Sequence, residues 1–229
     1  MKTAKTTKMT SNAHGLAISL LLLSALGALL FVVRVFSSDG IRYWFLLWNL
    51  LLAWVPLGLA YLLHKNLKKF RWQHWSNIGL TFLWLGFLPN SFYLISDLIH
   101  LHDSGEVGYL FDVVMFMVLI LAGMCSGYIS MLIVHHNLLK RWRHKISHGI
   151  IALTILATSF AIYLGRSLRW NTWDVLVNPF GILFDISERF VRPSTSDELL
   201  GITILFFMLI GSMYMVIWQS LIFVRKLIK

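Results

Sequence analysis

The sequence predicts an all-α membrane protein, a bundle of six transmembrane helices with both termini on the cytoplasmic side. Three observations predict it. The 229 residues are 58% hydrophobic and only 13% charged, a balance that would leave a soluble globule with too little polar surface. The apolar residues fall into six runs of about 20 residues, the length that crosses a bilayer. Basic and acidic residues alternate from one connector between these runs to the next.

The six apolar runs set the predicted spans. They show no period-two alternation, so helices rather than barrel strands are expected to satisfy the backbone in lipid. The first run follows a basic segment, 1–15. It is too long for a signal-peptide core and lacks a small-residue cleavage site, so we expect it to be retained as a span. The predicted spans, within a single domain over 16–225, are 16–36, 43–63, 77–96, 108–134, 149–165 and 199–223.

Charge orients the chain. Basic residues cluster at both termini, between spans two and three, and between spans four and five. The positive-inside rule places these segments in the cytoplasm. All acidic residues lie on the opposite connectors or, in the case of Asp112, just inside span four. The net charge of +10 comes from short clusters beside apolar runs, so the expected partner is the lipid bilayer and not nucleic acid. The single cysteine, Cys125, excludes an intrachain disulfide.

The connector 166–198 is too long for a simple turn, and it has an apolar side that Asn178, Pro179 and Gly181 interrupt. We predict that its segment 172–190 is an interfacial helix or a shallow re-entrant element. An amphipathic loop packed on lipid remains an alternative.

The end of span three carries one candidate site, in the string LPNSFYLISDLIHL. Asn90, Tyr93, Asp97 and His100 are spaced 3, 4 and 3 residues apart, so they form one polar stripe if the helix continues past Pro89. A carboxylate and an imidazole at this spacing can act as a general base with its orienting partner, or share a metal. A helix end that faces water is the alternative.

Asp112 lies within an apolar run. A carboxylate in hydrocarbon costs several kcal/mol, so it must face the bundle, become neutral or pair with a cation. If span four begins a turn later, Asp112 simply touches water.

Arg166 and Arg169 lie at helical spacing at the end of span five, in the string YLGRSLRWNTWD. Two guanidinium groups on one face suit phosphate or carboxylate. They could equally clamp the acids of the chain itself, Asp97, Asp112 or Asp174.

These strings resemble an uncharacterised family of bacterial membrane proteins, the domain of unknown function 1361, over about residues 45–220. The family usually has Pro-Asn-Ala-Pro-Tyr and Gly-Arg-Phe-x-Arg-Trp-Asn-Ser-Trp-Asp, and this chain departs from it at Ser91, Phe92, Ser167 and Thr172. The resemblance implies a bacterial plasma membrane and a shared site, but no activity. That site is formed by Pro89, Asn90, Tyr93, Asp97, His100, Asp112, Arg166, Arg169, Asn171, Trp173 and Asp174.

The predicted roles follow from these groups. Asp97 and His100 are candidate base and orienting residue, and Asp112 and Asp174 are supporting carboxylates or ligands of a divalent metal. Anion or ligand binding falls to Arg166, Arg169, Asn90, Tyr93, Asn171 and Trp173.

Three functions stay open. The first is an enzyme that acts on an anionic lipid headgroup or envelope component at the outer leaflet, although no G-x-S-x-G or H-E-x-x-H signature is present. The second is transport or binding of a proton, small anion or lipid headgroup. The third is a scaffold subunit whose ion pairs are structural.

Overall fold

The computed structural model describes residues 2–38, 41–102, 108–167 and 193–228, together with seven positions between 177 and 187. In these segments the secondary structure is helical, with no strand. Six helices among the described residues are long and apolar enough to cross a membrane. The prediction of an all-α fold with six candidate spans is therefore confirmed.

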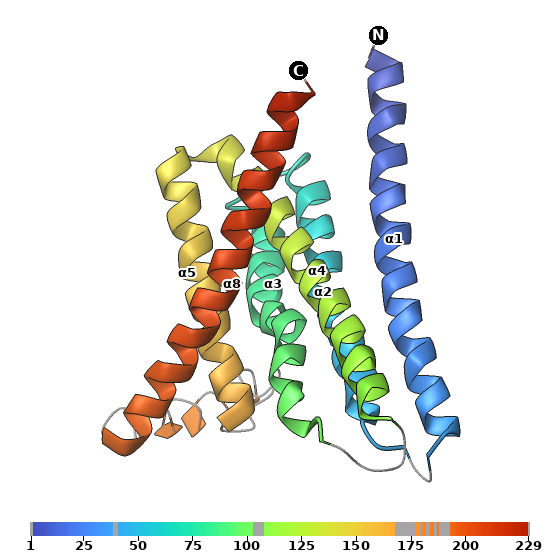
Figure 1. The fold of residues 1–229 in the computed structure, drawn as a ribbon. Helices are drawn as coiled ribbons and strands as arrows, with labels where there is room; N and C mark the ends of the chain where they lie inside the picture. The colour runs from blue at the N-terminus through green and yellow to red at the C-terminus, as the bar shows by residue number, and fades with distance from the viewer. Residues whose placement is uncertain are drawn as a thin grey trace. The chain divides into compact units, whose positions relative to one another are not determined.

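Each predicted span falls almost entirely within helical residues, and the helices follow one another in the predicted order (Figure 1). Several helices extend beyond the spans; the fourth continues to Arg141 and the fifth begins at His144. Basic residues at a span border extend the helix, because their long side chains reach the headgroup region from its last turn. In chain order the elements are α1 (Lys2–Phe36), α2 (Trp44–Asn66), α3 (Trp75–Tyr93), the 3-10 helix η1 (Leu94–His100), α4 (Tyr109–Arg141), α5 (His144–Ser167) and α8 (Pro193–Leu227).

The long connector before α8 lies mostly outside the described residues, so the interfacial or re-entrant element predicted at 172–190 stays a prediction. Its described apolar side chains Val177, Phe180 and Phe184 are exposed.

The chain divides into two compact units. Unit 1 consists of residues 1–54 and 90–127, and unit 2 of residues 55–89 and 128–229. Because the division cuts α2, α3 and α4, each of these helices contributes residues to both units. The units are described separately.

Unit 1 is held by close backbone approach and by shared carbonyls. Gly27 of α1 lies so near α4 that an added Cβ would be 2.6 Å from Leu119 Cδ2. The hydroxyls of Ser91 and Ser126 both donate to the carbonyl of Ala53, at 2.9 Å each. One carbonyl of α2 thereby joins α3 and α4.

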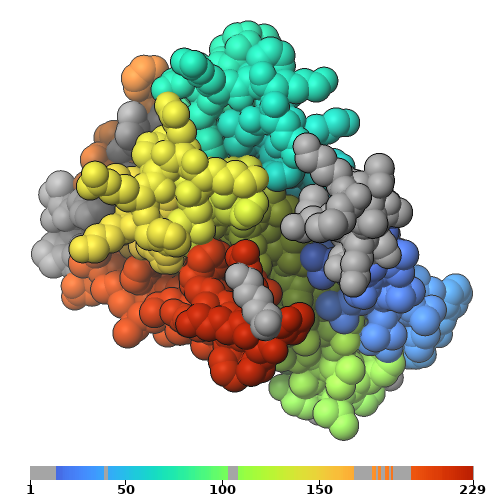
Figure 2. Space-filling model, turned by 90° about the horizontal axis from the view of Figure 1, so that it is seen from above, coloured from blue at the N-terminus to red at the C-terminus, as the bar shows by residue number. Residues whose placement is uncertain are grey.

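Unit 2 contains the pairing of α5 with α8, which run side by side (Figure 1). Ile155 and Ile162 of α5 and Ile210 of α8 are buried. The space-filling view shows the last turns of α8 in red beside the first turns of α5 in yellow (Figure 2). On another side of the unit, the buried Trp84 of α3 donates to the Ser130 hydroxyl of α4 at 3.3 Å.

Candidate functional site

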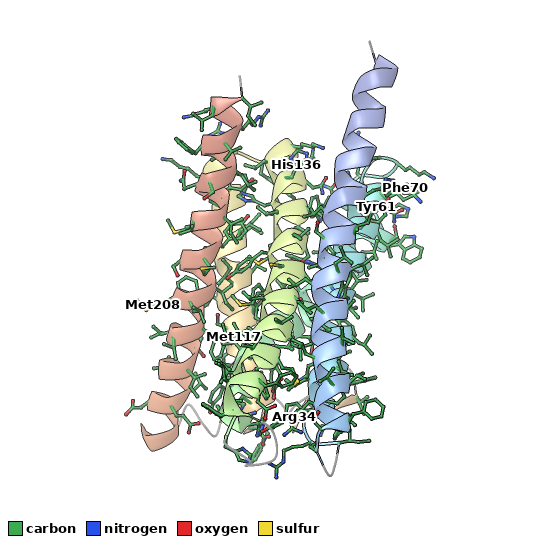
Figure 3. All side chains as sticks on the ribbon, turned by 45° about the vertical axis from the view of Figure 1, so that its right-hand side comes forward. Arg34, Tyr61, Phe70, Met117, His136 and Met208 are labelled. Atoms are coloured by element: carbon green, nitrogen blue, oxygen red, sulfur yellow. The ribbon has the colours of Figure 1, made fainter. Side chains whose placement is uncertain are left out.

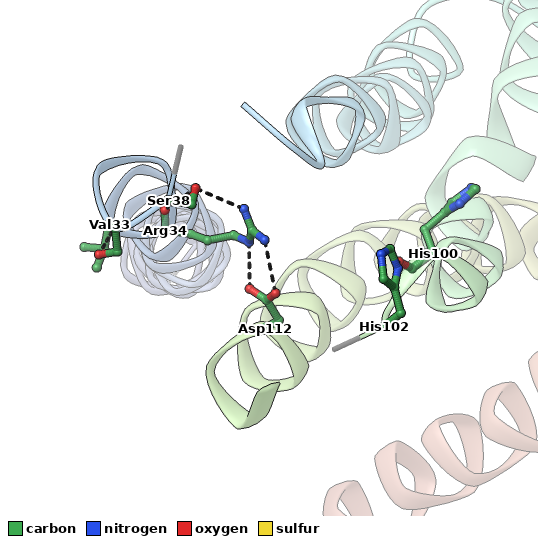
Figure 4. Close-up of polar contacts among 7 residues, drawn as sticks. Val33, Arg34, Ser38, His100, His102 and Asp112 are labelled. Carbon is green, nitrogen blue, oxygen red and sulfur yellow. Dashed lines mark hydrogen bonds and ion pairs between the residues drawn. The ribbon is translucent and has the colours of Figure 1, made fainter. Parts of the chain in front are cut away.

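Asp112 finds its cation on the first helix. Arg34 lies in the last turn of α1 (Figure 3). Its Nε is 2.8 Å from Asp112 Oδ1 and its Nη2 is 3.3 Å from Oδ2, a two-point ion pair with both side chains fully buried (Figure 4). Nη1 also donates to the Ser38 hydroxyl at 3.3 Å. Of the options that the sequence left open for Asp112, the structure shows an ion pair, and its cation is a residue that sequence reasoning did not single out.

One aromatic ring covers the guanidinium group of Arg34, and a second ring packs against the first. Arg34 Cζ lies 4.6 Å from the ring centroid of Tyr43, and the edge of Phe116 meets the same ring at 5.0 Å. Tyr43 adopts a φ of 66°, a left-handed conformation that costs a bulky residue on the order of 1–3 kcal/mol. The surrounding packing holds it there, and its hydroxyl is buried without a hydrogen-bond partner among the described residues.

Asp97 is the second buried acid of unit 1. The α-helix tightens into η1 after Tyr93, and this turn holds the Asp97 carboxylate inside the unit at 2% exposure. Asn49 of α2 donates its amide to Asp97 Oδ2 at 2.8 Å. We use the name acidic cluster for two groups of residues in unit 1: Arg34, Tyr43 and Asp112 form the first, and Asn49 and Asp97 form the second.

The rest of the predicted stripe has mixed environments. Asn90 and Tyr93 are half-buried, whereas His100 is exposed and its ring meets Phe45 at 5.2 Å. His100 and His102 lie apart from the ion pair (Figure 4). The predicted pairing of Asp97 with His100 stays a prediction.

The other predicted site residues lie near the end of α5 or beyond it. Arg166 is half-buried in its last turn. Arg169, Asn171, Trp173 and Asp174 lie outside the described residues. Within the part of the chain that the structure describes, no group of three His, Cys, Asp or Glu side chains could hold a metal ion.

The sequence contained signals for the two partners that we missed. Arg34 is the one charged residue in the apolar run 16–36, and Asn49 is a carboxamide in the middle of the run 43–63. Polar groups within spans usually face other polar groups, so each could have been matched to a buried acid.

A different kind of site lies in unit 2. A cavity of about 520 Å³ opens between α5 and α8, within the range of ~300–1,000 Å³ typical of small-molecule pockets. Met208, on one side of α8, contributes to it (Figure 3). We call this cavity the groove. Its lining residues are His148, Ile151, Ala152 and Ile155 of α5 and Phe207, Met208, Gly211, Ser212, Tyr214, Met215, Trp218 and Gln219 of α8.

His135 of α4 lies against three of the residues that line the groove. Its Nδ1 is 2.6 Å from the Tyr214 hydroxyl, and its ring lies 4.6 Å from the ring of His148 and 4.3 Å from that of Trp218. The side chain is fully buried. Its Nε2 has no hydrogen-bond partner among the described residues. We call His135, His148, Tyr214 and Trp218 the His135 cluster.

The tautomer of His135 decides whether its unpartnered Nε2 is a hydrogen-bond donor or an acceptor. If the Tyr214 hydroxyl donates to Nδ1, Nε2 carries the proton and is a donor; if Nδ1 donates, Nε2 is an acceptor. Either state leaves one polar atom of the ring without a partner among the described residues. Leaving such an atom unsatisfied costs about 1–3 kcal/mol.

Comparison with known families identifies the chain. The family described as "Protein of unknown function (DUF1361)" matches residues 48–217. The chain belongs to this family. No curated protein and no solved structure matches it.

The DUF1361 match covers most residues of both clusters. It includes Asp112 and Asp97 but begins after Arg34, so the cation that neutralises Asp112 comes from a helix outside the matched region. His135, His148 and Tyr214 all fall inside the match. The resemblance inferred from the sequence motifs is thereby confirmed, and the family assignment itself specifies no activity.

Proposed function

We propose that this DUF1361 protein is a multi-pass membrane protein that binds an amphiphile, in the first instance a membrane lipid, in the groove between α5 and α8. The charge pattern and the family resemblance support a bacterial plasma membrane with both termini in the cytoplasm. The single observation that carries the proposal is an apolar cavity, three of whose lining residues contact the buried His135, a side chain whose Nε2 has no partner among the described residues.

The chemistry of the groove selects the class of ligand. Its walls are mostly aliphatic, aromatic and thioether side chains, which suit an acyl chain. Bulk lipid tails can fill such a groove, but they offer nothing to a polar nitrogen. An occupant that binds better than bulk lipid therefore needs a polar group near the His135 cluster, where His148, Tyr214 and Gln219 also line the cavity.

The acidic cluster supports a structural role more than a catalytic one. Arg34 engages both carboxylate oxygens of Asp112, which leaves that carboxylate poorly suited to act as a base. An enzymatic role for Asp97, His100 and Asp174, with Arg166 and Arg169 as anion binders, stays a prediction.

The groove can be filled by one substitution. A Cβ at Gly211 would meet nothing within 4 Å, so Gly211→Leu places a side chain into the cavity without a clash at its base. Gly201 is a matched control: it lies on the same helix, also has nothing within 4 Å of an added Cβ, and does not line the groove.

Native mass spectrometry of the purified full chain tests the proposal. We expect the wild type and Gly201→Leu to retain a lipid through mild delipidation, and Gly211→Leu to lose it several-fold. Added phosphatidylglycerol, lysophospholipid or fatty acid should raise the Tm of the wild type but not that of Gly211→Leu. If the wild type retains no lipid and none of the three amphiphiles raises its Tm, the proposal is wrong.

A further inference from the structure

A second cavity in unit 2 has a lining of opposite character. It measures about 200 Å³ and is formed by the α2–α3 connection and the last turns of α4. We propose that this cavity binds a phosphate group, carried by a membrane lipid headgroup or by a small soluble phosphate. It shares no residue with the groove. We call it the basic pocket; its lining residues are Leu67, Phe70, Arg71, Trp72, Asn137, Lys140 and Arg141.

One wall of the basic pocket is a loop whose backbone is fixed. The backbone amides of Lys69 and Phe70 both donate to the carbonyl of Asn66 at 2.9 Å, which closes the turn after α2. From α3, the buried Asn77 donates its amide to the carbonyl of Arg71 at 3.0 Å. The backbone of Arg71 is thus held in place while its side chain stays exposed.

The opposite wall of the basic pocket is the end of α4. The contacts of Asn137 with His64 and of Trp142 with Trp72 join it to α2 and to the loop after α2. His64 of α2 places Nδ1 3.0 Å from Oδ1 of Asn137, and the amide of Asn137 donates to the Ile133 carbonyl of its own helix at 2.8 Å. Beyond the end of α4, the ring of Trp142 meets Trp72 edge-on at 5.3 Å. The two walls that carry the cations are therefore pre-assembled before any ligand binds.

The charges of the basic pocket are not balanced by carboxylates of the segments that build it. The sequence has no Asp or Glu between residues 40 and 96 or between 113 and 173. In the described part of the chain, Arg71, Lys140 and Arg141 have no recorded ion pair. Three like charges at one cavity repel one another, and an anion between them relieves that repulsion.

The residue types favour phosphate over a generic anion. Guanidinium groups offer paired N–H donors that match two phosphate oxygens, and an ammonium group adds a compact charge. Lys140 and Arg141 in the last turn of α4 also complement the helix dipole. Arg71 lies in the loop between α2 and α3, so it does not complement the dipole of α4. It nevertheless lines the same cavity.

The predicted orientation of the chain places the basic pocket on the cytoplasmic side of the membrane. The positive-inside rule places this end of the bundle in the cytoplasm, where basic pockets beside spans bind phospholipid headgroups. A lipid phosphate and a soluble phosphate offer the same oxygens, so the experiment must separate the two sources.

The test uses the purified full chain in phosphatidylcholine nanodiscs with and without phosphatidic acid, and native mass spectrometry to count retained phosphatidic acid. Arg71→Gln and Arg141→Gln remove the two forks, and Arg71→Lys keeps the charge but loses one fork. Lys68→Gln and Arg143→Gln are matched controls that remove the same charge from neighbouring positions outside the lining. All four substituted positions are exposed, and thermal unfolding checks that each of the five variants folds.

We expect the wild type to retain phosphatidic acid, each of Arg71→Gln and Arg141→Gln to weaken retention at least about tenfold, and the controls to change it less than about twofold. Arg71→Lys should fall between them. Competition by inorganic phosphate identifies a soluble phosphate as sufficient; retention that inorganic phosphate does not affect identifies the lipid headgroup. Equal losses in the lining and control variants, or no retention of either phosphate source by the wild type, would overturn the proposal. Filling the groove with Gly211→Leu should leave this binding unchanged, so the two sites can fail independently.

Discussion

The acidic cluster and the groove place polar groups in apolar surroundings in opposite ways. In the acidic cluster the two buried carboxylates meet partners: Arg34 holds Asp112, and Asn49 donates to Asp97. In unit 2, the buried His135 has one ring nitrogen without a partner among the described residues, and its ring packs against residues that line a cavity of about 520 Å³. A satisfied buried charge specifies geometry, whereas an unsatisfied buried donor or acceptor beside open space indicates that a ligand completes the site.

The largest effect should come from breaking the ion pair. Arg34→Met leaves the Asp112 carboxylate buried without a cation, and we expect a loss of about 3–5 kcal/mol in unfolding free energy. The double variant Arg34→Met/Asp112→Leu should recover most of this loss, because no uncompensated charge remains. Unfolding in detergent micelles measures both values.

An exposed arginine provides the control for that experiment. Arg225→Met removes the same charge from the surface of α8 and should change the unfolding free energy by less than about 0.5 kcal/mol. Purely additive losses from Arg34→Met and Asp112→Leu would show that the two side chains do not stabilise the fold as a pair.

Hydropathy and charge predicted the spans well because lipid imposes one rule on every backbone group. Pairings within the bundle depend on helix rotation and packing, which hydropathy does not encode. Asp112 was expected to face the bundle, become neutral or pair with a cation, but Arg166 and Arg169 were the arginines considered as its partners and Arg34 was overlooked. The His135 cluster was missed for a different reason: the predicted span four ends at residue 134, whereas α4 continues to Arg141 and His135 packs against Tyr214 and Trp218.

Alanine substitutions at two glycines compare how tightly the helices pack in unit 1 and at the groove. At Gly127 of α4, an added Cβ would lie 2.7 Å from Ser91 Cβ and 2.8 Å from the Phe92 ring, whereas at Gly211 it would meet nothing within 4 Å. Gly127→Ala should cost about 1–3 kcal/mol through overpacking. Gly211→Ala should be neutral or stabilise α8 by up to about 1 kcal/mol through helix propensity. Thermal unfolding of the two variants in one detergent measures the difference, and equal effects would show that the groove closes in the absence of a ligand.

The smallest effect on stability should come from the His135 cluster, where ligand binding should change most. Tyr214→Phe removes one hydrogen bond, worth about 1 kcal/mol. His135→Phe/Tyr214→Phe removes both partners together with the unfilled nitrogen, so the lipid-free double variant should be as stable as the wild type or slightly more stable. The same double variant should bind amphiphile several-fold more weakly, as measured by the ligand-induced rise in Tm. The double variant would then keep or gain unfolding free energy while it loses affinity for the amphiphile. Removal of a purely structural hydrogen bond would not have this combined effect. A loss of several kcal/mol in the lipid-free double variant would instead give the His135 cluster the same structural role as the ion pair of Arg34 and Asp112.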